Sequence, residues 1–129
     1  MLTSQAIKTM LEMAPNTEVS LEAIDAILPQ IDQQTILQQE TARYRIEVKS
    51  FNALSEIFQQ MMPCQDCFAF SIYVDDSLVM FQPHNPTISG HIPMTEIEAN
   101  TLADATLTQL AKSSAESKII AEVKTLLSL

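Results

Sequence analysis

A single glycine, Gly90, in a chain of 129 residues is the feature that most limits what this sequence can fold into. Phosphate-binding loops depend on glycine, because only a residue without a side chain lets backbone N–H groups approach a phosphate closely. With one glycine, the sequence contains neither the G-x-G-x-x-G fingerprint nor the P-loop. We therefore expect no nucleotide-binding α/β domain, and a helix-rich chain with few tight turns.

Length and apolar content favour one folded domain covering residues 1–129. A chain of this length buries roughly two-thirds of its unfolded surface, and 47% hydrophobic residues supply a normal core. No apolar run is long enough to span a bilayer, and the N-terminus lacks the basic start and apolar block of a signal peptide. Two cysteines do not make a secreted disulfide framework. We expect a cytoplasmic location.

Short helices are expected at both ends of the chain. Apolar residues at helical spacing predict helices over about residues 5–13 and 18–28, with a break at Pro15 between them. Two Ser/Thr-x-x-Glu capping boxes, which begin at Thr95 and Ser113, predict the starts of two further helices. These cover about residues 95–112 and 114–128.

The stretch from Gln30 to Met62 contains no glycine or proline and is expected to be one long amphipathic helix, or two in line. Its large side chains recur every seven residues, at Leu37, Tyr44, Phe51 and Phe58. Residues 44–49 also alternate between apolar and charged side chains, as a half-buried strand would. We favour helix, because the helical pattern continues on both sides of them.

Next comes a β-hairpin of Phe68–Val74 and Ser77–Phe81, joined by Asp75-Asp76. The expected pairs are Val74 with Ser77, Ile72 with Val79, and Phe70 with Phe81. The expected inward face is Phe68, Phe70, Ile72, Val74, Val79 and Phe81. The predicted fold is thus α+β and predominantly helical, with helices around one hairpin in the order α-α-long α-β-β-α-α.

The net charge of −9 is distributed unevenly. No lysine or arginine occurs between Thr9 and Ala42, or between Ser50 and Ala111. Such a field repels phosphate backbones and anionic membranes, so we expect no nucleic-acid or membrane partner. It favours encounter with a basic protein surface, although acidity also keeps proteins soluble without further function.

Cys64 and Cys67 form the C-x-x-C motif of this chain. The expected hairpin places Cys67 opposite His84, and His91 follows seven residues later, so a Cys2His2 zinc site is geometrically conceivable. One C-x-x-C without a second pair is not specific. We favour the alternative that Cys67 packs as a small apolar residue, and we expect no metal and no cofactor.

The same residues offer little for catalysis. A reactive C-x-x-C normally begins a helix, whereas this one follows an expected helix and contains Asp66. A dyad of Cys67 and His84 would lack a visible oxyanion-hole loop. Asp75 and Asp76 are read as turn formers rather than paired catalytic carboxylates. We expect no enzymatic activity and no catalytic residues, with a small enzyme using Cys67 and His84 as one alternative.

The function expected from the sequence is binding of another protein. The chain resembles, by analogy alone, small acidic accessory proteins of bacterial or phage type: inhibitors, immunity-type proteins, assembly chaperones or adaptors. A zinc-stabilised binding domain is the other alternative, and the apolar helix faces are compatible with a two-fold homodimer. The expected partner-binding residues are Asp75, Asp76, His84, Asn85, His91, Glu96, Glu98 and Asp104.

Overall fold

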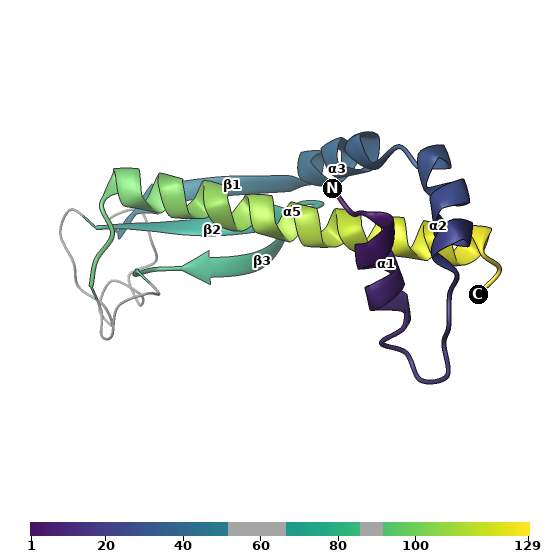
Figure 1. The fold of residues 1–129 in the computed structure, drawn as a ribbon. Helices are drawn as coiled ribbons and strands as arrows, with labels where there is room; N and C mark the ends of the chain where they lie inside the picture. The colour runs from purple at the N-terminus through teal and green to yellow at the C-terminus, as the bar shows by residue number, and fades with distance from the viewer. Residues whose placement is uncertain (52–66, 86–91) are drawn as a thin grey trace. The chain divides into compact units, whose positions relative to one another are not determined.

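The computed structural model describes residues 1–51, 67–85 and 92–129. Over these ranges the fold is α+β and mostly helical, in the order α-α-α-β-β-β-α (Figure 1). The elements are α1 (Ser4–Leu11), α2 (Leu21–Ile27), the 3-10 turn η1 (Leu28–Gln30), α3 (Gln33–Ala42), β1 (Tyr44–Ser50), β2 (Phe68–Val74), β3 (Ser77–Gln82) and α5 (Glu96–Leu126). The chain forms two compact units, the first of residues 1–41 with 111–129 and the second of residues 42–110.

Side-chain caps set where the first two helices begin. Thr3 and Ser20 have extended backbones, and their hydroxyl oxygens accept hydrogen bonds from the N–H groups of Ala6 at 3.1 Å and Ala23 at 3.3 Å. Each cap satisfies an N–H group that has no partner within the helix. The two expected N-terminal helices are confirmed as α1 and α2, and both are shorter than predicted.

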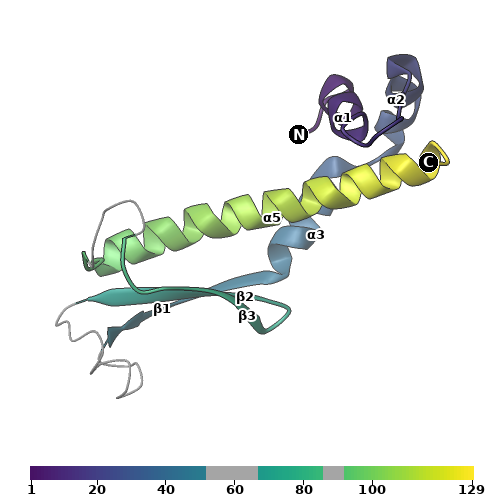
Figure 2. The same ribbon diagram turned by 90° about the horizontal axis from the view of Figure 1, so that it is seen from below.

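The core of the first unit lies between α1, α2 and the C-terminal part of α5 (Figure 2). Its buried apolar side chains are Ile7, Leu11, Val19, Ile24, Ile31, Ile119 and Val123. Ile119 and Val123 are four residues apart, so they lie on one side of α5. With 8 and 7 residues, α1 and α2 are too short to be stable alone. Burial of this cluster, at about 1.5–3 kcal/mol per large side chain, therefore stabilises them.

The second unit contains one antiparallel sheet with the strand order β1-β2-β3. The prediction of a helix through residues 43–49 is wrong: α3 ends at Ala42, and β1 pairs along its whole length with β2, from Tyr44 opposite Val74 to Ser50 opposite Phe68. Residues 44–49 therefore form a strand, as their alternation of apolar and charged side chains allows, because they pair with a strand that is distant in sequence. Residues 52–62 of the expected helix lie outside the described residues.

A β-bulge in the hairpin changes which side chains of β3 face the core. The observed pairs are Val74–Ser77, Tyr73–Leu78, Ile72–Met80, Ser71–Phe81 and Phe70–Gln82. The first pair was predicted, but the register shifts between Ile72 and Tyr73, so the predicted partners Val79 and Phe81 are wrong. One extra residue turns the following side chains to the other face. Met80 consequently packs on the core, while Val79 is 49% and Phe81 38% exposed.

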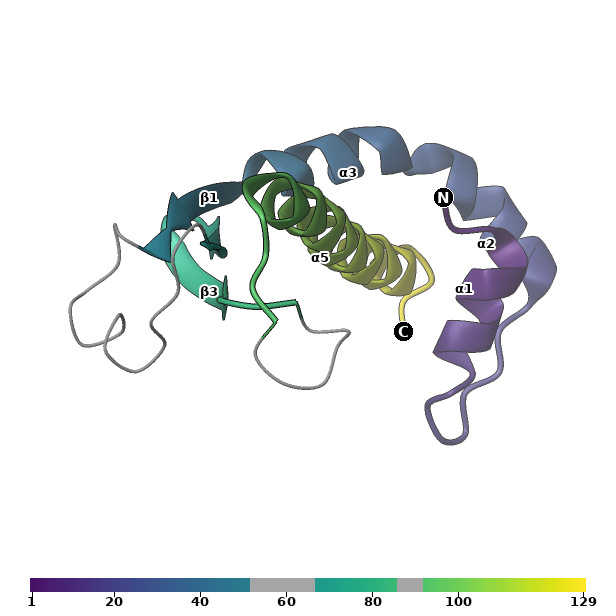
Figure 3. The same ribbon diagram turned by 90° about the vertical axis from the view of Figure 1, so that its left-hand side faces the viewer.

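The first half of α5 covers one face of this sheet (Figure 3). Phe70 and Ile72 of β2 share a buried cluster with Met94, Ala99 and Ala103, so their predicted inward orientation is confirmed. The two alanines are four residues apart and lie on one side of the helix. Their small side chains let the helix backbone approach the large side chains of β2.

The two C-terminal helices that the sequence predicts are one helix, α5, which runs from Glu96 to Leu126. The prediction of a break before residue 114 is wrong, because no glycine or proline interrupts this stretch. The hydroxyl of Ser117 donates to the carbonyl oxygen of Ser113 within the helix, where Ser113 was expected to cap a new one. Among the described residues, no helix combines the length and apolar content needed to cross a membrane.

Candidate functional site

Asp75 and Asp76 form the two-residue turn of the hairpin, as predicted. Both have positive φ, 49° and 64°, which Asp tolerates better than most residues. Asp75 accepts hydrogen bonds from Arg43, at 2.6 Å from Nη2 and 3.1 Å from Nε. Asp76 lies 3.8 Å from Arg45. The two aspartates and the two arginines line a hollow of about 380 Å³. Arg43 and Arg45 thus offset the negative charges of Asp75 and Asp76, which the sequence predicted to bind a partner.

The remaining charges of β1 are also paired with one another. Glu47 lies 2.6 Å from Lys49 and 3.0 Å from Arg45. The hydrogen bond from Lys49, and then that from Arg45, lowers the pKa of Glu47, and the same contact with Glu47 raises the pKa of Lys49. The Arg45 guanidinium also stacks 4.2 Å above the Tyr73 ring. Beside the hairpin turn, acidic and basic groups therefore compensate each other.

His84 and Asn85 follow the other end of β3. The side-chain amide of Gln82 donates to the carbonyl oxygen of His84 at 2.8 Å, and the backbone N–H of Asn85 donates to the carbonyl oxygen of Ile92 at 3.2 Å. His84 is partly buried. His91 and Cys64, which the sequence places in the same constellation, lie outside the described residues.

Cys67 is 3% exposed and disulfide-bonded. A sulfur in a disulfide is neither a zinc ligand nor a nucleophile, because both roles need the thiolate. The zinc-site and cysteine-enzyme alternatives therefore apply only to a reduced form. In the described part of the chain, no three or more His, Cys, Asp or Glu residues are placed to hold a metal. The expected cytoplasmic location stays a prediction.

The acidic residues at the start of α5 have a different environment from those of the hairpin. Thr95 caps the helix: its hydroxyl oxygen accepts from the N–H of Glu98 at 3.1 Å and lies 3.1 Å from the Glu98 carboxylate. Glu96, Glu98 and Asp104 are exposed, and none of them forms an ion pair with a described residue. Their negative charge is therefore available to a partner.

Two of the predicted residues, Asn85 and Glu98, meet at a shallow hollow of about 360 Å³ beside the first turns of α5. Its lining residues are Asn85, Met94, Ile97, Glu98, Thr101, Leu102 and Ala105. Met94 is buried in the core below, and Ile97 is 79% exposed at the rim. Sequence reasoning identified the acidic residues here but missed the apolar ones, because Ile97 and Leu102 read as ordinary helix positions.

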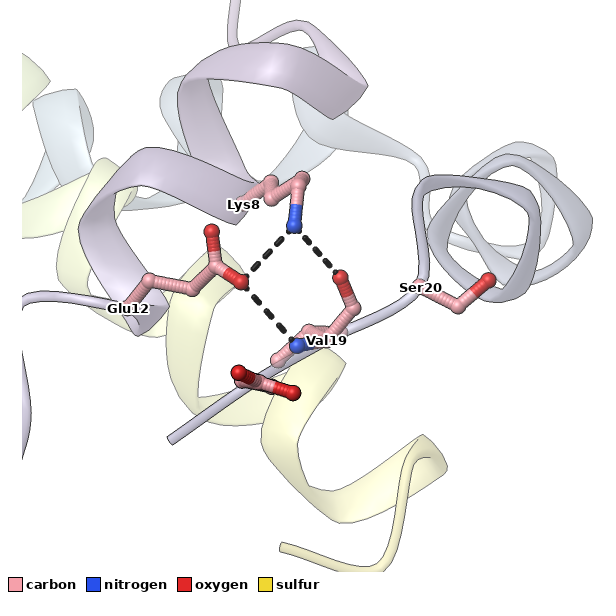
Figure 4. A pocket seen from close by; sticks show the side chains of 5 residues that line it. Lys8, Glu12, Val19 and Ser20 are labelled. Carbon is pink, nitrogen blue, oxygen red and sulfur yellow. Dashed lines mark hydrogen bonds and ion pairs between the residues drawn. The ribbon is translucent and has the colours of Figure 1, made fainter. Parts of the chain in front are cut away.

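A third hollow, of about 510 Å³, lies in the first unit and is lined by Lys8, Glu12, Glu18, Val19 and Ser20 (Figure 4). Lys8 donates to the Glu12 carboxylate at 2.7 Å and to the Val19 carbonyl oxygen at 2.8 Å, while Glu12 accepts from the Val19 N–H at 3.2 Å. The hydrogen bond from Lys8 lowers the pKa of Glu12. In the sequence, the four-residue spacing of Lys8 and Glu12 could have predicted this ion pair. We interpret this cluster as a clamp on the α1–α2 connection.

Comparison with protein-family models, with curated proteins and with solved structures found no match to this chain.

Proposed function

We propose that this protein is a small acidic module without enzymatic activity that binds a basic surface of another protein, as an inhibitor, immunity-type protein, assembly chaperone or adaptor does. One observation carries the proposal: the acidic residues divide into compensated and uncompensated groups. Asp75 and Asp76 are matched by arginines. Glu96, Glu98 and Asp104, by contrast, form no ion pair with a described residue.

The uncompensated group suits a docking role for electrostatic reasons. Exposed charges that are already paired gain little from a partner, because the partner must compete with the existing contact. Exposed unpaired carboxylates attract a basic surface during encounter and oppose an acidic one. The hydrogen bonds that Asn100 and Thr108 donate to Glu96 and Asp104 end on backbone carbonyl oxygens, so the side-chain charges can be changed without loss of these bonds.

The experiment is affinity capture with the full chain, followed by a salt titration of each captured complex. We expect capture of a basic protein whose binding weakens clearly between about 0.1 M and about 1 M salt, where the Debye length falls from about 10 Å to about 3 Å. The double variant Glu96→Gln/Asp104→Asn should weaken that binding. Glu98 is left unchanged because it contacts the helix cap.

The matched control is Glu18→Gln/Asp25→Asn, which removes the same charge from exposed positions of the first unit. We expect it to bind like the unmodified chain. Equal losses in both double variants would mean that net charge alone, not this surface, governs binding. A complex that is insensitive to salt would contradict the proposal and move the contact to an apolar helix face. The two-fold homodimer stays a prediction, which sedimentation of the purified chain would test.

A further inference from the structure

The hollow beside the first turns of α5 has buried or partly buried apolar side chains at its base and an exposed apolar side chain at its rim. Met94 and Leu102, which line it, also pack in or against the buried cluster under the sheet. Ile97 at its rim is 79% exposed. Covering an aliphatic side chain of this size releases about 1.5–3 kcal/mol, so this rim gains from contact with another apolar group.

Helix geometry makes this a continuous strip rather than scattered positions. Ile97, Thr101 and Ala105 are spaced four residues apart, so they follow one another along one side of α5. Thr101 and Ala105 are small and exposed. The surface therefore drops from the large side chain of Ile97 to the small ones that follow, above Leu102.

Acidic groups border the strip. Glu98 lines the hollow itself. Asp104 follows Ile97 by seven residues, close to two helical turns, and so lies on the same side of the helix. Neither carboxylate forms an ion pair with a described residue. The combination accepts an apolar side chain with cations beside it and disfavours a second copy of this chain, which would bring the same carboxylates together.

Building on the proposed function, we infer that this hollow seats one apolar side chain from a lysine- or arginine-rich segment of the partner, whose cationic groups lie against Glu98 and Asp104. The apolar contact supplies affinity, and the charges supply steering and selectivity.

Three synthetic peptides of equal length test this inference on the full chain, with binding measured by fluorescence anisotropy. The first is lysine-rich with one central leucine, the second has serine in place of that leucine, and the third keeps the leucine but has glutamate in place of lysine. We expect the first to bind about tenfold more tightly than the second, and the third not to bind.

Variants of the protein locate the effect. Thr101→Gln/Ala105→Gln fills the hollow without changing charge or helix propensity greatly, and should abolish the tenfold difference between the leucine and serine peptides. The control Asn100→Gln/Ala121→Gln places the same side chains at exposed positions of α5 outside the hollow and should preserve it. Circular dichroism of each variant verifies folding.

The outcomes separate the two proposals. Equal binding of the leucine and serine peptides, or a difference that survives in Thr101→Gln/Ala105→Gln, overturns the hollow as the anchor site while salt-sensitive binding of both lysine peptides still supports the proposed function. If the lysine peptides bind no better than the glutamate peptide, the proposed function fails together with this inference.

Discussion

Glu40 is the only buried charged side chain among the residues that the structure describes, at 1% exposed. One carboxylate oxygen accepts a hydrogen bond from the hydroxyl of Ser114, and the other lies 2.6 Å from the ammonium group of Lys118. Both partners come from the C-terminal part of α5, so this carboxylate ties α3 to α5 within the first unit. The two ends of the ion pair are not equivalent, because Lys118 is 57% exposed.

This asymmetry predicts unequal costs of removing the two ends of the ion pair. Lys118→Ala removes the cation that lies 2.6 Å from this buried carboxylate. Breaking a buried pair typically costs 3–5 kcal/mol; since water already reaches the Lys118 site, we expect about 2–3 kcal/mol. Glu40→Leu leaves an ammonium that water can solvate and fills the site with apolar volume, so about 1 kcal/mol or less is expected. In the Glu40→Leu background, Lys118→Ala should then cost almost nothing.

Urea denaturation of the four proteins in this cycle, with linear extrapolation, measures each free energy of unfolding. Lys112→Ala is the matched control, because Lys112 is an exposed lysine of the same helix, and its effect should remain within about 0.5 kcal/mol. Either of two results would contradict this prediction: a cost of Lys118→Ala no larger than that of Lys112→Ala, or a cost as large in the Glu40→Leu background as in the native chain.

Two further predictions concern the hairpin turn and the response to acid. Asp76→Val should destabilise the fold by about 1–2 kcal/mol, because a β-branched residue is strained at positive φ. Asp76→Gly removes the same ion pair with Arg45 but not the tolerance of positive φ, so it should cost clearly less in thermal unfolding. Equal costs of the two variants would contradict a backbone origin of the effect. Because its contact with Lys8 lowers the pKa of Glu12 in the folded chain, this contact contributes stability above the pKa of the unfolded chain and loses it as pH falls through the folded value. Glu12→Gln should therefore destabilise the protein at pH 7 and flatten the acid side of its stability profile, and an unchanged profile in urea unfolding would contradict the clamp.

Local chemistry made several elements predictable from the sequence. Three features act within a few residues: the break at Pro15, the cap at Thr95 and the Asp75-Asp76 turn. Their effects can therefore be predicted from the residues adjacent to them in sequence. The same holds for the buried face of β2, where Phe70 and Ile72 alternate with smaller or polar residues. These parts needed no knowledge of what packs against them.

Long-range pairing decided what the sequence left open. Residues 44–49 fit a strand and, within their surroundings, a helix, and only pairing with β2 selects between them. The bulge opposite Ile72 and Tyr73 is likewise set by how β3 meets β2, and it turned Phe81 from an expected core residue into an exposed one. The site was affected in the same way: its acidic residues were visible in the sequence, while the hollow beside them depends on how Met94 and Asn85 meet α5.

The position of the arginines explains why negative charge alone was an incomplete guide to the proposed docking surface. Asp75 and Asp76 are adjacent acidic residues in the second unit, yet β1 runs antiparallel to β2 and brings Arg43 and Arg45 to the hairpin turn from about thirty residues away. Strand pairing thus compensates the negative charges of Asp75 and Asp76, the most conspicuous acidic residues in the sequence. The acidic residues Glu96, Glu98 and Asp104 of α5 form no such ion pair with a described residue. A sequence count treats both groups alike, and only the pairing of β1 with β2 separates the charges that serve the fold from those available for binding.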